Sequence, residues 1–329
     1  MHIVDKLLKH EVLLTEMSSP KPQLALKIDV DTYRGTREGV PPLVDLLKKH
    51  NAGATFLWSL GPDHTGRAIK RVFRPGFLQK VSRTSVVEHY GIRTLLYGTL
   101  LPGPDIARKC AELMRSVRDA GFEVGIHTYD HVRWQDGVAD AGATWTRAEM
   151  DKAVEAFKSV FGASPLTHGA AGWQMNNVAY QHEQALGMRY ASDGRGTHPF
   201  IPVVDGVRVE VPQLPSTLPT LDELIGVGDI TPDNVHEHIL ALTASPSPYG
   251  HVYTLHSELE GMKWMPAFDR LLTGWREQGY ELVSTETMFN SLDLAALPAH
   301  EVKMGSIPGR SGILAVQGAR VEAQTSIGA

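Results

Sequence analysis

Short apolar segments alternate with amphipathic segments along most of the chain, and this alternation constrains the fold more than any other feature. The strand candidates are 23–30, 53–60, 122–126, 166–171, 188–192, 207–211, 251–255 and 280–283. The helix candidates between them are 37–50, 105–120, 146–161, 175–186, 231–243 and 266–278. Many of these helices end at a glycine, the residue that left-handed helix ends favour. Repeated strand–helix units predict an α/β protein with a parallel sheet, either open or closed into a barrel.

The same alternation predicts one main domain at 23–297. Residues 1–22 carry apolar side chains at helical spacing and end at a Ser-Ser-Pro sequence, which predicts a short helical extension. The stretch 61–104 is far longer than a usual strand-to-helix connection, and long insertions of this kind are usually functional. Glycine, serine and alanine dominate residues 298–329, so we expect a partly irregular C-terminal segment.

Composition excludes several classes of protein. With 42% hydrophobic residues among 329, the chain can bury a core, and a formal charge of −5 lacks the basic field of a nucleic-acid binder. The one cysteine, Cys110, cannot form an intrachain disulfide, which favours a reducing compartment. No apolar run is long enough to span a bilayer, although attachment to a membrane surface stays open. The motifs of serine hydrolases, P-loop enzymes and zinc fingers are missing from the sequence.

Two aspartates and two histidines follow predicted strands at spacings that suit a metal site. Asp29 and Asp31 leave the same face of the first strand at its carboxyl end, although a pair of turn-forming aspartates would give the same pattern. His127 and His131 lie four residues apart, and a helical turn there would bring both imidazoles onto one face. Together with Asp31 they make a site of two histidines and one aspartate. Three ligands leave positions for water and substrate, as catalytic rather than structural zinc sites do.

A further histidine, His256, directly follows an apolar strand late in the chain. A lone histidine there would be read as a satisfied polar residue at a strand end. A metal site at the same edge of the sheet favours a functional role instead.

The order of these features along the chain resembles the five motifs of the polysaccharide deacetylase (NodB-homology) superfamily. The features are Asp29 and Asp31, His127 and His131, a Gly-rich strand end at 169–173, Asp193, and His256. More closely, segments 28–40, 61–63, 170–173, 192–196 and 253–261 resemble the deformylase branch that acts on 4-deoxy-4-formamido-L-arabinose carried by undecaprenyl phosphate. The similarity runs from about residue 23 to 317 and includes the insertion. The resemblance implies a distorted (β/α) barrel of about seven parallel strands.

The resemblance also implies a role for each candidate residue. Asp29 would be the general base and His256 the general acid, while Asp31, His127 and His131 would hold one divalent metal ion. Zinc leads by its general affinity order, and two histidines with one carboxylate also accept manganese or cobalt.

The sequence departs from the superfamily pattern in two places. It reads Asp-Val-Asp where members commonly have two adjacent aspartates, and His168–Trp173 stands where an Arg-x-Pro-Tyr motif is usual. The arginine that usually orients the base is therefore missing from its expected place, and we predict Arg195 as its substitute. The other supporting residues that we predict are Asp193, Glu258, Trp173 and Arg34.

The insertion combines basic and apolar residues. Between residues 67 and 93 it has seven Lys or Arg and one acid, Glu88, interleaved with apolar side chains. This pattern suits contact with an anionic membrane, and an amphipathic helix packed on the barrel would show it equally well. The resemblance implies an enzyme on the cytoplasmic face of the inner membrane that forms the aminoarabinose lipid and formate for lipid A modification. A soluble N-deacetylase of amino sugars or peptidoglycan-like material, and a non-catalytic carbohydrate- or lipid-binding relative, are the alternatives.

Overall fold

A parallel β-sheet of seven strands forms the centre of the protein, in a computed structural model that describes residues 21–68, 91–310 and 312–322. Six strands follow the order β5-β4-β3-β2-β1-β8, and β9 pairs with the first residues of β1. The strands are β1 (Gln23–Val30), β2 (Thr55–Ser59), β3 (Glu123–Thr128), β4 (Thr167–His168), β5 (Tyr190–Ala191), β8 (His251–His256) and β9 (Glu281–Val283). The prediction of an α/β fold with about seven parallel strands is confirmed.

The sheet curves into a half-barrel whose edge strands are β5 and β8. The irregular segment 212–217 runs between these edges. Leu214 N donates to Ala191 O of β5 at 2.8 Å, and Thr217 N donates to Val252 O of β8 at 3.0 Å. Because this link is a loop and not a strand, the barrel is distorted.

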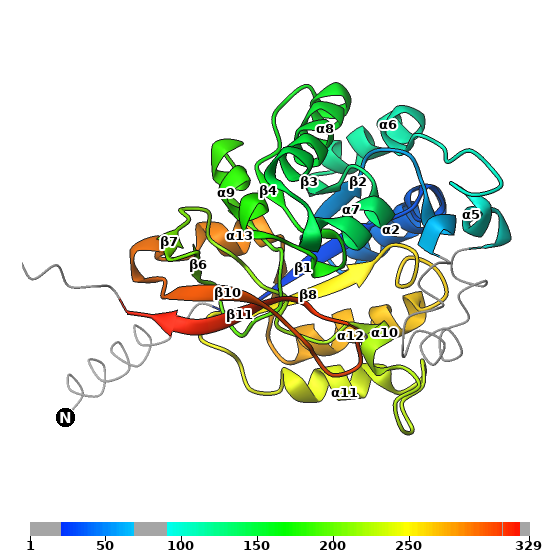
Figure 1. Cartoon of the computed structure of the whole chain (residues 1–329). Helices are drawn as coiled ribbons and strands as arrows, with labels where there is room; N and C mark the ends of the chain where they lie inside the picture. The colour runs from blue at the N-terminus through cyan, green and yellow to red at the C-terminus, as the bar shows by residue number, and fades with distance from the viewer. Residues whose placement is uncertain (1–20, 69–90, 311, 323–329) are drawn as a thin grey trace, which may run out of the picture.

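Helices cover the outside of the sheet, so its strands are buried on both faces, as parallel strands usually are. In β1, for example, Leu24, Leu26 and Ile28 are all fully buried. Figure 1 shows α8 and α9 on one side of the sheet and α11 and α12 on the other. The longer helices are α2 (Val40–Lys49), α6 (Ile106–Asp119), α8 (Ala143–Phe161), α9 (Asn177–Ala185), α11 (Val235–Leu242) and α12 (Met265–Glu277).

A second sheet of four strands packs beside the first, in the order β11-β10-β6-β7. Its strands are β6 (Ile201–Val204), β7 (Val207–Arg208), β10 (Ala299–Gly305) and β11 (Leu314–Val321). The strand candidate at 207–211 therefore lies here and not in the parallel sheet. Asp205 and Gly206 both have positive φ, at 52° and 77°, and form the two-residue turn of a β6–β7 hairpin. The C-terminal segment, expected to be partly irregular, contributes two of the four strands.

Parts of two predicted segments lie outside the described residues. These are residues 1–20 of the N-terminal extension and 69–90 of the insertion, which hold most of its basic and apolar side chains. The described part of the insertion includes α5 (Ile92–Leu96). Within the described ranges, no helix has both the length and the apolar character that crossing a membrane requires.

Candidate active site

The carboxyl end of β1 carries the two aspartates of the site. Lys27 and Asp29 occupy alternate positions near the end of the strand, and Asp31 follows directly after it. Asp29 is 3% exposed and Asp31 9% exposed, so both carboxylates are buried. Burying a carboxylate is costly unless charged or hydrogen-bonding partners surround it, so the neighbours of these two side chains define the site.

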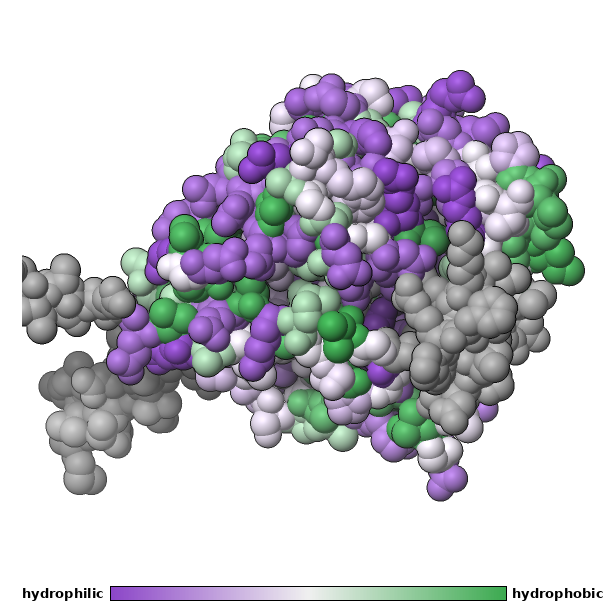
Figure 2. Space-filling model, viewed as in Figure 1, coloured by the Kyte–Doolittle hydropathy of each residue, from purple (hydrophilic) through white to green (hydrophobic). Residues whose placement is uncertain are grey.

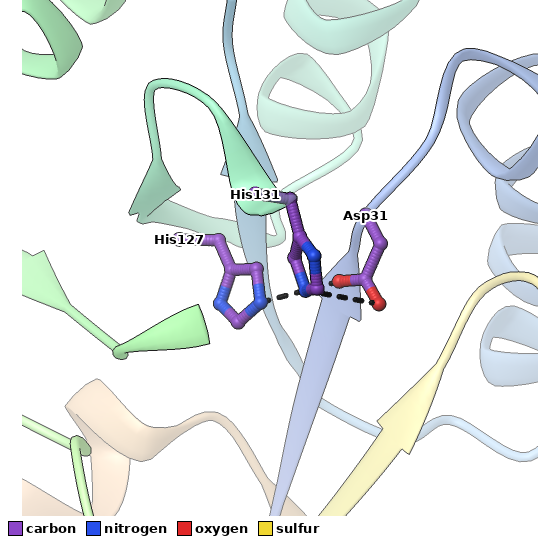
Figure 3. Close-up of side chains that lie close together, drawn as sticks. All are labelled: Asp31, His127 and His131. Atoms are coloured by element: carbon purple, nitrogen blue, oxygen red, sulfur yellow. Dashed lines mark ion pairs between the residues drawn. The ribbon is translucent and has the colours of Figure 1, made fainter. Parts of the chain in front are cut away.

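Asp31 faces two histidines that come from β3 and from the helix after it, α7 (His131–Gly137). His127 Nε2 lies 3.2 Å from Asp31 Oδ1, and His131 Nε2 lies 3.4 Å from Asp31 Oδ2 (Figure 3). His127 belongs to the end of the strand and His131 is the first residue of the helix, which Asp130 caps. The four-residue spacing therefore spans a strand-to-helix turn and not one helical turn.

These three residues fit a divalent metal ion. One ligand atom from each lies within 4.8 Å of the other two, and Asp31 Oδ1 is buried with no hydrogen-bond partner among the described residues. His127 Nδ1 lies 2.6 Å from Gly169 O and donates to it, which leaves the lone pair of Nε2 facing Asp31. Burial by itself would raise the pKa of Asp31, but the charges of His131 and His127 hold it well below its ordinary value. Two imidazoles and an ionised carboxylate suit zinc, manganese or cobalt.

Glu258 shapes the turn that follows β1. Its Oε1 accepts hydrogen bonds from Asp31 N at 3.2 Å, Thr32 N at 2.8 Å and Thr32 Oγ1 at 2.7 Å. Burial, followed by the charge of Asp31, raises the pKa of Glu258 to about 8. Gly35 makes room for this carboxyl group, because a Cβ at residue 35 would overlap it. Glu258 thus fixes the backbone from which Asp31 projects.

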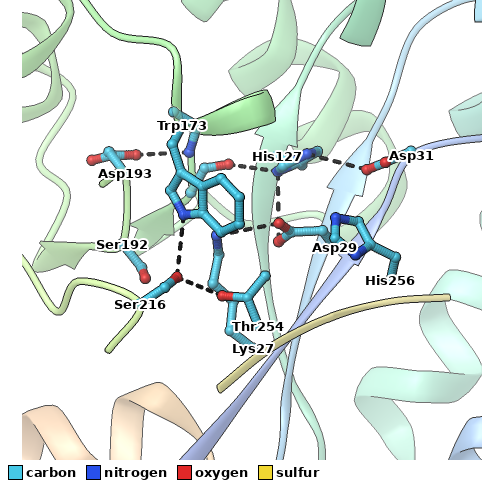
Figure 4. Close-up of polar contacts among 12 residues, drawn as sticks. Lys27, Asp29, Asp31, His127, Trp173, Ser192, Asp193, Ser216, Thr254 and His256 are labelled. Carbon is cyan, nitrogen blue, oxygen red and sulfur yellow. Dashed lines mark hydrogen bonds and ion pairs between the residues drawn. The ribbon is translucent and has the colours of Figure 1, made fainter. Parts of the chain in front are cut away.

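Asp29 and His256 are register partners on the neighbouring strands β1 and β8. Asp29 Oδ1 has no hydrogen-bond partner among the described residues, and neither does the buried His256 Nδ1. The backbone N–H of His256 donates to Glu260 Oε2 at 2.9 Å, which fixes the end of β8. A candidate base and a candidate acid therefore lie side by side next to the candidate metal-ligand cluster (Figure 4).

The structure does not place Arg195 beside Asp29. The Arg195 Nη1 instead donates to both carboxylate oxygens of Glu223, at 2.7 and 2.9 Å, and its guanidinium lies 5.0 Å from the centre of the Trp173 ring. Trp173 is buried and donates from Nε1 to Ser216 Oγ at 3.1 Å. Arg34 pairs with Glu38 at 2.9 Å on the partly exposed first helical turn after β1.

Asp193 belongs to a separate, fully buried group with His168 and Glu183. His168 Nδ1 lies 2.7 Å from Asp193 and 2.8 Å from Glu183. Burial lowers the pKa of His168, but the charges and hydrogen bonds of Asp193 and Glu183 together outweigh it and raise the pKa to about 10. One nitrogen or oxygen atom from each of these three side chains lies within 4.8 Å of the other two, a spacing that a metal ion could also use. The pairing of His168 with both carboxylates already explains why the three side chains are buried together. Asp193 also accepts from Ala170 N at 2.9 Å and so supports the loop that holds His127.

The residue that sequence reasoning missed is Lys27. It is fully buried, and its Nζ donates to Asp29 Oδ2 at 3.3 Å. The signal was present in the sequence: a single charged residue interrupts the apolar run of β1, two positions before Asp29 and therefore on the same face.

Comparisons with known proteins agree with this geometry. Residues 17–191 match the polysaccharide deacetylase family. Over 92% of this chain and 97% of the relative, the sequence is 36% identical to a probable 4-deoxy-4-formamido-L-arabinose-phosphoundecaprenol deformylase of Shewanella sediminis (strain HAW-EB3). A protein of the same name from Wigglesworthia glossinidia brevipalpis is 28% identical over 86% of this chain and 98% of the relative.

A solved structure shows a similar fold. A polysaccharide deacetylase described as putative, from Mycobacterium smegmatis, aligns with a TM-score of 0.61 and 17% identity, over 88% of this chain and 98% of the other. At that identity the match supports the fold alone.

Proposed function

The chain belongs to the polysaccharide deacetylase family, and we propose that it removes the formyl group from 4-deoxy-4-formamido-L-arabinose carried by undecaprenyl phosphate. The products would be formate and the free 4-amino-4-deoxy-L-arabinose lipid used for lipid A modification. The observation that carries the proposal is the convergence of Asp31, His127 and His131 beside the pair formed by Asp29 and His256. The name and coverage of the relative from Shewanella sediminis support the choice of substrate.

The site residues divide the work of breaking an amide, whose carbonyl is a poor electrophile and whose nitrogen is a poor leaving group. Asp31, His127 and His131 would hold the divalent ion, which when bound supplies Lewis-acid polarisation of the formyl carbonyl and of water. Zinc leads by affinity order, and manganese and cobalt suit the same ligands.

The chain's own groups then move the protons. Asp29 Oδ1, which has no other partner among the described residues, takes a proton from the attacking water. His256, next to Asp29 across the β1–β8 pair, delivers a proton to the sugar nitrogen as the C–N bond breaks. The leaving group is then a neutral amine, and the carbonyl carbon leaves as formate.

The test is formate release by purified protein from a lipid-linked formamidopentose, with and without a chelator. We expect chelation to stop release and His131→Ala to reduce it at least 100-fold, because the residue is a metal ligand. His182→Ala is the control, because His182 pairs with Asp151 on the outer face of α9. If His131→Ala and the chelator leave formate release unchanged, the metal-dependent mechanism is wrong.

The same assay separates the alternative activities. An N-acetylated amino sugar tests the soluble deacetylase, for which acetate release would exceed formate release. If neither acid appears while the protein still binds the lipid-linked sugar, the chain is a non-catalytic binding relative and the proposal fails.

Peripheral attachment to the cytoplasmic face of the inner membrane is part of the proposal. It is supported by apolar side chains on the described part of the insertion, where Ile92 is 69% exposed and Leu100 is 80% exposed. Figure 2 shows this apolar surface at the edge formed by α5. We expect an Ile92→Ser, Leu100→Ser variant to sediment less with anionic phospholipid vesicles than the parent. Equal sedimentation would contradict this contact.

A further inference from the structure

Lys27 is a buried lysine built into the strand that carries the base. It is fully buried within β1, and lysine is almost never fully buried unless it is paired. Its Nζ donates to Asp29 Oδ2 at 3.3 Å. Among the residues that the structure describes, no other lysine or arginine forms an ion pair with Asp29.

The surroundings of Lys27 are shaped to hold its ammonium group. Gly169 lies against the end of the side chain, where a Cβ would come within 2.8 Å of Lys27 Cε and 3.3 Å of Nζ. The ring of Trp173 lies on another side, with its centre 5.5 Å from Nζ. Figure 4 shows Lys27, Asp29 and His127 gathered beside this ring. The ammonium group of Lys27 is therefore surrounded by the backbone of Gly169, which leaves room for it, by the ring of Trp173 and by one carboxylate oxygen of Asp29.

The two oxygens of Asp29 have different environments. Oδ2 is held by the Lys27 ammonium, while Oδ1 has no hydrogen-bond partner among the described residues and lies 3.7 Å from His127 Nδ1. His127 Nδ1 donates to Gly169 O, so it does not compete for Oδ1. Pinning one oxygen fixes the rotation of the carboxylate and leaves the other directed at the metal-ligand cluster.

Two other cations near the site, Arg195 and His168, could in principle hold the Asp29 carboxylate in place of Lys27, but both have other partners. Arg195 donates to Glu223 through Nη1, to Ser216 O through Nε and to Leu218 O through Nη2. His168 uses Nδ1 for the carboxylates of its own buried group.

We propose that Lys27 is the positioning residue for the base, holding Asp29 Oδ2 so that Oδ1 accepts the proton of the attacking water. This inference rests on the proposed function. Base and orienting cation then come from one strand, two residues apart.

The test compares Lys27→Met and Lys27→Arg with the parent for formate release, metal content and thermal unfolding. We expect Lys27→Met to lower kcat by about 10- to 100-fold, as loss of an orienting partner typically does, with KM within threefold. Metal content should stay at the parent value, because the ion pair of Lys27 is with Asp29 and not with Asp31, which pairs with the two histidines. Lys27→Arg keeps the cation and should retain at least a tenth of the parent kcat, and at least three times the kcat of Lys27→Met. Lys49→Met is the matched control, because Lys49 also pairs with an aspartate, Asp269, but on the exposed surface.

A folded Lys27→Met protein with the parent's kcat would overturn the proposal, as would equal losses of kcat in the Met and Arg variants. If Lys27→Met does not fold, the Arg variant decides the matter. A folded Lys27→Arg protein with less than a tenth of the parent kcat contradicts the proposal. Failure of the proposed function looks different, because the parent itself would then release no formate. In that case the variants are compared on acetate release from an N-acetylated amino sugar, where the same ratios are expected.

Discussion

Gly169 allows the loop after β4 to approach β1 closely, and replacing it with alanine should disturb both the core and the site. The new Cβ would overlap a methyl group of Leu57 and come within 2.8 Å of Lys27 Cε. Both side chains are buried, with Leu57 1% exposed and Lys27 0%, so neither can swing into solvent. Overpacking of this kind typically costs about 1 to 3 kcal/mol.

The same shift would reach the site through two contacts. Gly169 O accepts the hydrogen bond from His127 Nδ1 at 2.6 Å, and Lys27 holds Asp29. We therefore expect Gly169→Ala to lower the free energy of unfolding by about 2 kcal/mol and kcat by about tenfold or more.

Urea unfolding and formate release measure these two effects separately. Gly142→Ala is the control, because Gly142 has a negative φ of −77° and a Cβ there would meet nothing within 4 Å. It precedes α8, so we expect a loss below about 1 kcal/mol and no change in kcat. Leu57→Val should partly relieve the clash, so its effect should be smaller in the Gly169→Ala background than alone. If Gly169→Ala is as stable and as active as Gly142→Ala, the close approach of this loop to β1 does not matter and the reasoning is wrong.

Three further predictions concern other parts of the chain. Burial raises the pKa of the Cys110 thiol to about 11. A thiol reagent at pH 8 should therefore modify Cys110 at least 100-fold more slowly than a free cysteine, and react quickly only after the protein unfolds. Fast modification of the native protein would contradict the burial of this thiol. The pKa of His168 is raised from 6.5 to about 10, so its stabilising contribution is complete below pH 6.5 and is lost as the pH rises through 10. Urea unfolding should therefore show stability falling over that range, and a slope unchanged in His168→Gln would contradict the assignment. Removing residues 299–329 exposes the surface covered by β10 and β11, where Leu314 is 2% exposed. This should lower the free energy of unfolding by about 3 kcal/mol or more, measured from the unfolding midpoint in urea. An unchanged midpoint would show that these two strands are dispensable for stability.

The parallel sheet could be predicted because its signals are local. The limits of β1 match the predicted segment because five apolar residues, interrupted only by Lys27 and Asp29, lie between Gln23 and Asp31. The predicted group of Asp31, His127 and His131 is brought together because the ends of β1 and β3 meet at one edge of the sheet. The period of two along a strand is enough to place such residues on one face.

The second sheet and the base-orienting cation could not be predicted in the same way. Strand β10 reads as a mixture of polar and apolar residues, because most of it is only partly buried. The Asp205–Gly206 turn is a hairpin signal, but the strands on either side of it are only four and two residues long. The partner of Arg195, Glu223, belongs to the short helix α10 (Leu221–Leu224), 28 residues further along the chain. Such pairings depend on tertiary packing that a single sequence does not display.

Positions 27, 29 and 31 alternate along β1, so one stretch of backbone supplies the buried ammonium, the carboxylate beside it and the carboxylate facing the imidazoles. A one-residue insertion or deletion in β1 before Lys27 would turn all three charges toward the opposite face together, and one between Lys27 and Asp31 would place them on different faces. Laboratory evolution toward new amide substrates should therefore find few tolerated length changes in β1. Its variants should accumulate instead at positions outside β1 that do not touch these three charges.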